Sequence, residues 1–265
     1  MASTLICFII VVLVVQRTYG ARLPDPLLVG GTASSWGSFP SAAFIRTPFL
    51  SYCGAAVIHP EFVITLAQCV FNTTTQPEHY EVIAGDLNIF PESFQRQARN
   101  VLEVIIHQNY TEYNLKNDIA LLRVDRSFTL PSNTVELTVR RTQIVPNGAV
   151  CELPGWGIIS TTSVGKIESS QKYLSLEILD RDMCNEANNH ASHVRENMLC
   201  AGNLFQSTNA VCSGNFGSPL YCEGQLTGML SFGVNCGLPN DPPVFTQVRY
   251  FNRWIDEQIQ SRMKQ

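Results

Sequence analysis

Basic side chains are scarce in this sequence. Its 265 residues include 18 lysines and arginines against 22 aspartates and glutamates, a net charge of −4 with histidine neutral. This balance argues against a nucleic acid or heparin as partner, and against a cationic antimicrobial role. The sequence also lacks internal repeats, low-complexity runs and long linkers, so we expect no appended module before or after the main body.

Histidine is rare as well, with five residues. His190 and His193 are spaced as neighbours on one helical face, but the surrounding sequence supplies no third ligand for a metal ion. We therefore expect a solvated histidine pair, no metal site and no cofactor.

The apolar run at residues 5–15 is too short to span a bilayer, which takes about 20 residues in a helix. Residues 18–20 then fit a cleavage site, so we predict a signal peptide at 1–20, a short leader at 21–27 and secretion to the extracellular space. A retained signal anchor is the alternative. Cleavage would remove Arg17 and leave 17 basic and 22 acidic residues, a net charge of −5 with no membrane attachment.

The chain has nine cysteines, of which Cys7 lies in the predicted signal peptide. The remaining eight suit four disulfides in an oxidising compartment. Two sequons, at Asn72 and Asn109, predict N-glycosylation in the secretory pathway. We therefore expect a secreted, disulfide-bonded glycoprotein.

Short apolar segments separated by turn residues predict an all-β fold. Leu174, Leu176 and Ile178 alternate with polar residues, as in a half-buried strand. Residues 57–58 and 62–64 flank a His-Pro-Glu turn as two strands of a hairpin would.

The C-terminal tail has a different period. Its apolar residues recur at intervals of three and four, which predicts an amphipathic helix against the core. The residues on that face are Phe251, Trp254, Ile255, Ile259 and Met263.

Several motifs together resemble the chymotrypsin-like serine proteases, in the order and spacing of that family. They are Leu28-Val29-Gly30-Gly31, Cys53-Gly54, Asn117-Asp118-Ile119-Ala120-Leu121-Leu122, Gly155-Trp156-Gly157, Cys212-Ser213-Gly214 and Pro219-Leu220. The resemblance implies two packed six-stranded antiparallel β-barrels, at about 28–140 and 141–248, and a C-terminal helix at about 250–264. Residues 28–265 would form this one domain.

The resemblance also implies how the eight cysteines pair. The expected disulfides are Cys53–Cys69, Cys151–Cys222, Cys184–Cys200 and Cys212–Cys236. Cys69 would therefore not be a free thiol nucleophile.

The catalytic triad of the family is degenerate in this sequence. Asp118 matches the carboxylate that orients the imidazole, and Ser231 matches the serine that hydrogen-bonds it. Gln68 stands where the histidine is expected, and an amide does not accept a proton near neutral pH. Phe216 offers carbon where the nucleophilic hydroxyl is expected. Ser218 matches a glycine two residues further on, and we interpret it as a packing residue.

The activation switch of the family is also absent from the pattern. Leu27 precedes the Leu28 motif where a basic residue is expected, and Asn215 replaces the aspartate that would pair with the new terminal amine. Cleavage after the nearest upstream arginine, Arg22, would leave a new amino terminus that is too long to insert in the way usual for the family. Backbone amides of Gly214 and Phe216 could still form a nest like an oxyanion hole.

The expected substrate pocket departs from a trypsin pattern. Ala210 stands at the pocket floor, Phe232-Gly233 replaces Trp-Gly, and Pro243 replaces a wall glycine. A basic substrate side chain would meet no counter-charge there. The adjacent basic pair Arg140-Arg141 could be a nicking site or a contact, but we expect it to be solvated.

These departures predict a secreted protease homologue that binds and does not cut. Its partner would be an extracellular protease, a zymogen or a microbial surface. It resembles the inactive arthropod members without a clip domain, which implies a cofactor, decoy or regulator in a protease cascade or in innate immunity. The alternative is a serine-type endopeptidase with an unorthodox or residual site.

Overall fold

The computed structural model describes residues 28–29, 31–48, 52–71, 76–159, 166–167, 170–187, 194–202, 210–211, 215–233 and 241–264. Antiparallel strands are the main secondary structure of these residues. Within these ranges, no helix is both long and apolar enough to cross a membrane.

The first barrel closes in the order β3-β4-β5-β8-β7-β6. Its strands are β3 (Ala42–Arg46), β4 (Tyr52–His59), β5 (Phe62–Thr65), β6 (Glu81–Ala84), β7 (Gln97–Ile106) and β8 (Ala120–Val124). The predicted hairpin around Pro60 is confirmed, because β4 and β5 pair across it.

The second barrel closes in the order β13-β17-β16-β15-β9-β12, since β12 also pairs with β13. Its strands are β9 (Val150–Gly155), β12 (Lys172–Leu179), β13 (Met198–Gly202), β15 (Pro219–Cys222), β16 (Gln225–Phe232) and β17 (Val244–Gln247). The alternation predicted for β12 is confirmed: Leu174, Leu176 and Ile178 are buried and the residues between them are exposed.

Five short strands and one short α-helix lie outside the two barrels in the part of the chain that the structure describes, and one of these strands, β2, joins the edge of the second barrel's sheet. The strands are β1 (Leu28–Val29), β2 (Thr32–Ala33), β10 (Ile158–Ile159), β11 (Lys166–Ile167) and β14 (Ala210–Val211), and the helix is α1 (Arg181–Glu186). β1 pairs with β14, and β2 pairs with β12. Residues 28–29 and 32–33 therefore lie against strands of the second half, not in the first barrel.

Strand β3 of the first barrel is buried on both faces. Ala43 and Ile45 point into the barrel core, while Ala42 and Phe44 pack in a second cluster with Trp156. A two-sided environment explains why β3 is a nearly continuous apolar run and not an alternating one.

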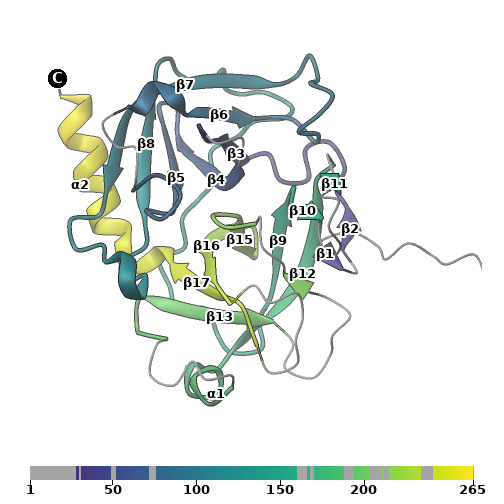
Figure 1. The fold of residues 1–265 in the computed structure, drawn as a ribbon, viewed down its shortest axis with the longest axis vertical. Coiled ribbons are helices and arrows are strands. Elements are labelled where there is room, and N and C mark those ends of the chain that lie inside the picture. The colour runs from purple at the N-terminus through teal and green to yellow at the C-terminus, as the bar shows by residue number, and fades with distance from the viewer. Residues whose placement is uncertain are drawn as a thin grey trace, which may run out of the picture.

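The C-terminal helix α2 (Asn252–Met263) follows a 3₁₀ turn at Val248–Phe251 and runs alongside β8 (Figure 1). Trp254 and Ile255 are buried against the first barrel. The predicted helical face is correct except for Met263, which is 49% exposed because the last turn extends past the core. The two barrels and the helix confirm the predicted fold class.

Candidate active site

The carboxylate of Asp118 lies between the barrels, just before β8. Asp118 is 1% exposed, and its backbone carbonyl oxygen accepts a hydrogen bond from Thr246 Oγ1 of β17 at 2.8 Å. The preceding Asn117 has a positive φ of 54° and donates to the carbonyl of Asn109 at 2.8 Å. Anchors from both barrels therefore hold Asp118 in place.

Gln68 approaches Asp118 from the turn that follows β5. Its backbone N–H donates to Asp118 Oδ1 at 2.9 Å, and its side-chain Nε2 donates to Asp118 Oδ2 at 2.6 Å. The same Nε2 donates to the carbonyl of Ser231 at 2.9 Å. One amide group thus links a carboxylate of the first barrel to a strand of the second.

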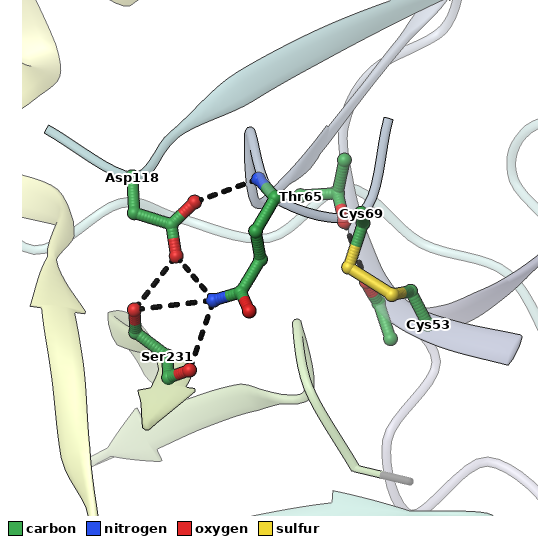
Figure 2. Close-up of a disulfide and its surroundings, with 7 residues drawn as sticks. Cys53, Thr65, Cys69, Asp118 and Ser231 are labelled. Carbon is green, nitrogen blue, oxygen red and sulfur yellow. Dashed lines mark hydrogen bonds between the residues drawn. A yellow bond between two sulfur atoms is a disulfide. The ribbon is translucent and has the colours of Figure 1, made fainter. Parts of the chain in front are cut away.

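Ser231, at the end of β16, completes this cluster. Its hydroxyl donates to Asp118 Oδ2 at 2.7 Å, and Figure 2 shows this bond with the disulfide Cys53–Cys69 nearby. Burial raises the pKa of Asp118 above its usual value, and the hydrogen bonds from Ser231 and Gln68 oppose that shift. In the part of the chain that the structure describes, no lysine, arginine or histidine forms an ion pair with Asp118. The donors to the Asp118 carboxylate that the structure describes are therefore all neutral.

Phe216 lies in a tight turn before β15. Its carbonyl accepts from the N–H of Gly54 at 2.7 Å, and the Asn215 carbonyl accepts from the N–H of Ser218 at 2.9 Å. Gly217 has a φ of 79°, and a Cβ there would collide with the carbonyl of Gly54. The half-buried Phe216 ring packs against the apolar cluster between the barrels.

Ser218 is 2% exposed and lies two residues beyond Phe216, at the end of this turn. A Cβ on Gly155 would stand 3.3 Å from Ser218 Oγ. Among the described residues, no hydrogen bond joins Ser218 to Asp118 or to Gln68. This placement agrees with the interpretation of Ser218 as a packing residue.

Asn215 is 1% exposed. Its Oδ1 accepts from the N–H of Gly157 at 3.1 Å. A Cβ on Gly155 or on Gly157 would collide with the Asn215 amide, so only glycine fits at either position. The amide is therefore held tightly by the Gly-Trp-Gly motif.

A sequence model of one protein family decides where this chain belongs. The model, described as trypsin, matches residues 28–255. The chain belongs to the trypsin family. This agrees with the resemblance to chymotrypsin-like serine proteases, although it does not distinguish active members from inactive ones.

Individual trypsins are similar over most of this trypsin-family chain. Trypsin zeta of Drosophila melanogaster is 30% identical over 250 residues, 88% of this chain and 86% of the relative. Trypsin-2 of Salmo salar is 29% identical over 231 residues, 87% of this chain and 94% of the relative. Trypsin alpha-4 of Lucilia cuprina is 28% identical over 259 residues, 94% of this chain and 96% of the relative.

Three of the four predicted disulfides of this trypsin-family chain are confirmed. They are Cys53–Cys69, Cys151–Cys222 and Cys184–Cys200. The fourth predicted pair, Cys212 with Cys236, lies outside the described residues.

The predicted pocket residues are brought partly together. Ala210 of β14 pairs with Val29 of β1. Gly233 has a φ of 79°, and a Cβ there would stand 3.1 Å from Cα of Pro243. Phe232 precedes Gly233 at the end of β16 and pairs with Val244. Gly214 lies outside the described residues.

The other predicted sites have mixed outcomes. The sequon residue Asn109 is exposed, whereas Asn72 lies outside the described residues, as does the pair His190 and His193. Across the described ranges, no group of three or more histidine, cysteine or acidic side chains could hold a metal ion.

The expectation that Arg140 and Arg141 are simply solvated is wrong. Arg140 pairs with Asp256 at 2.6 Å, and Arg141, which is 8% exposed, pairs with Glu223 at 3.1 Å. Arg140 and Arg141 belong to residues 125–149, the linker between the two barrels. The tertiary fold brings both acids near this linker, so the sequence around positions 140–141 does not indicate them.

Sequence reasoning missed the role of the Gln68 amide. It treated Gln68 as a lost base, whereas the side chain donates to Asp118 and to Ser231. The available signal was the donor capacity of glutamine, since a primary amide carries two N–H groups. Such an arrangement links the two barrels, and a primary amide does not accept a proton near neutral pH.

Proposed function

We propose that this trypsin-family chain is a non-catalytic serine protease homologue, which acts by binding and does not cut peptide bonds. The proposal rests on one observation: the side chain that stands at the expected histidine position and hydrogen-bonds Asp118 is the amide of Gln68. A general base must take the proton of the nucleophile, and a carboxamide does not do so at physiological pH.

The turn that should present the nucleophile supports the same conclusion. Its residue Phe216 has no heteroatom on the side chain, and its ring packs against apolar residues. In a related chemistry, loss of the nucleophile or base alone costs about a millionfold in turnover, roughly 8 kcal/mol of barrier. Such effects do not add, but the remaining groups would leave only traces of activity.

Asn215 argues against activation by a new amino terminus. In an active relative the corresponding side chain would be a carboxylate that pairs with the inserted ammonium. Asn215 is neutral, is 1% exposed and already accepts from Gly157. A buried ammonium without a counter-charge costs several kcal/mol.

The names of the relatives favour the alternative, a serine-type endopeptidase with a residual site. Relatives such as Trypsin zeta are named as trypsins. We favour the binding role because activity depends on individual side chains, and a common fold does not supply them. Ser218 is the hydroxyl that the alternative would have to use.

We further propose that the protein works outside the cell, as a glycoprotein that binds a protease, a zymogen or a microbial surface. The predicted signal peptide, the three disulfides and the exposed sequon at Asn109 support secretion. A cofactor, decoy or regulator in a protease cascade or in immunity fits a preserved scaffold with altered chemistry.

Activity measurements on the full secreted chain test the catalytic part of this proposal. We expect no labelling by a fluorophosphonate probe and no turnover of a peptide library, with an active trypsin assayed alongside. Turnover that disappears in Ser218→Ala would refute the proposal in favour of the alternative. A Gln68→His, Phe216→Ser double variant gives the matched comparison, because it restores both reacting groups on the same scaffold.

A further inference from the structure

A groove of about 350 Å³ is lined by residues 38–41, by residues 136–139 and by Glu152, Tyr221 and Gly224 of the second half. Its floor is formed by the rings of Phe39 and Tyr221, which stack with centroids 6.0 Å apart. The hydroxyl of Tyr221 shares a buried hydrogen bond of 2.8 Å with Ser41 Oγ. The floor polar atoms are therefore satisfied, and the floor presents mainly aromatic carbon.

Two aliphatic side chains of the groove walls face solvent. Leu137 is 43% exposed and Val139 is 65% exposed. Their backbone is held firmly, because Thr138 N donates to Val57 O at 3.0 Å and Leu226 N donates to Val139 O at 2.9 Å. A ligand would therefore meet a preformed surface of mixed apolar and polar groups and would not have to order it, which favours affinity.

Two carboxylates also line this groove, from Glu136 and from Glu152 of β9. Over the ranges that the structure describes, neither forms an ion pair or a side-chain hydrogen bond. The nearby basic residues of the linker are already paired, Arg140 with an aspartate and Arg141 with a glutamate. The groove therefore combines apolar walls with uncompensated negative charge.

We propose that the groove binds a segment of another protein in which an arginine or lysine is flanked by aliphatic side chains. Aliphatic groups and the carbon stem of the basic residue would cover Phe39, Leu137 and Val139, while its charge approaches Glu136 and Glu152. An acidic segment would be repelled. The inference rests on the proposed binding role, and it names a recognition surface that shares no residue with the Asp118 cluster.

Selection from a display library of short linear peptides, against the purified full chain, tests this inference. We expect the enriched peptides to carry arginine or lysine next to leucine, isoleucine or valine. Fluorescence anisotropy with the enriched peptides should show about tenfold weaker binding to Val139→Asp and to Glu152→Lys. Higher salt should weaken binding as well, because part of the attraction is electrostatic.

Matched controls separate the groove from general changes in charge or hydrophobicity. Ile144→Asp alters an exposed aliphatic residue of the same linker, and Glu78→Lys makes the same charge change on the first barrel. Both should bind like wild type. Val139→Ser replaces Val139→Asp if the latter fails to fold.

The inference is overturned if no peptide is enriched, if the enriched peptides are acidic, or if binding survives both groove substitutions. These outcomes leave the proposal that the protein is non-catalytic unaffected, because none of them measures turnover. Conversely, turnover that depends on Ser218 would refute the non-catalytic proposal without changing the peptide result.

Discussion

Replacing Gln68 by leucine tests whether its amide is a structural link between the barrels. Leucine has similar bulk but removes the donor to Asp118 Oδ2 and to the Ser231 carbonyl. A hydrogen bond to a charged group contributes about 1.5–3 kcal/mol, and one between neutral groups about 0.5–1.5 kcal/mol. Because Asp118 is buried, water does not readily replace the lost donor, and we expect Gln68→Leu to lower the free energy of unfolding by about 2–4 kcal/mol.

Urea unfolding followed by circular dichroism measures this loss. Gln68→His is the matched control, since one ring N–H can still donate to Asp118 while the bond to the Ser231 carbonyl is lost. We expect its destabilisation to be smaller than that of Gln68→Leu. Unchanged m-values would show that both variants lose stability and not compactness.

The loss should also depend on pH. Burial raises the pKa of Asp118, and the hydrogen bonds from Gln68 hold it down, so Gln68→Leu raises the pKa further. A raised pKa in the folded state means that stability increases as the pH falls through it, because the folded protein binds the proton more tightly. The gap between wild type and Gln68→Leu should therefore narrow in acid.

A Gln68→Leu variant within about 0.5 kcal/mol of wild type at neutral pH would refute this reasoning. A gap that stays constant as Asp118 becomes protonated would refute the electrostatic part of it.

Two further predictions concern other buried polar groups. Arg96→Met removes the guanidinium that pairs with the buried Asp86 at 2.8 Å. We expect urea unfolding to show that this lowers the free energy of unfolding by about 3–5 kcal/mol. The control Arg253→Met, at a highly exposed ion pair, should leave that free energy unchanged, and equal effects of the two variants would contradict the prediction. Burial lowers the pKa of His107, so its contribution to stability is present above about pH 6.5 and is lost as the pH falls through the folded pKa. Titration by NMR should give a His107 pKa below the usual value. The loss of folding stability in acid should be smaller in His107→Phe than in wild type. A His107 pKa at the usual value, or an equal loss of stability in the variant, would contradict the prediction.

The fold was largely predictable because its signals are local or carried by family motifs. The alternation in residues 174–178 and the helical period at the C-terminus both depend on neighbouring residues, and the structure confirms both. Three disulfides followed from the family resemblance. Met263 departs from its predicted face because a period indicates which side chains share a face, and not how far the core extends.

The candidate site was predictable only in its chemical composition. The sequence identifies an amide at position 68 and a phenyl ring at position 216. It does not show that the amide nitrogen reaches Asp118 and Ser231 together, because those residues are 50 and 163 positions away. The pairing of Arg140 with Asp256 was missed for the same reason.

The sequence by itself determined which functional groups this protein possesses, since no folding can supply an imidazole at Gln68 or a hydroxyl at Phe216. Tertiary structure alone decided what those groups contact: closure of two barrels places a buried carboxylate between an amide and a serine, and leaves Glu136 and Glu152 beside an aromatic floor. The physical reason is the distance along the chain between the residues that determine each property. The chemical identity of a side chain and the local periodicity follow from neighbouring positions in the sequence, whereas the burial of a side chain and its contacts depend on residues that only packing brings together.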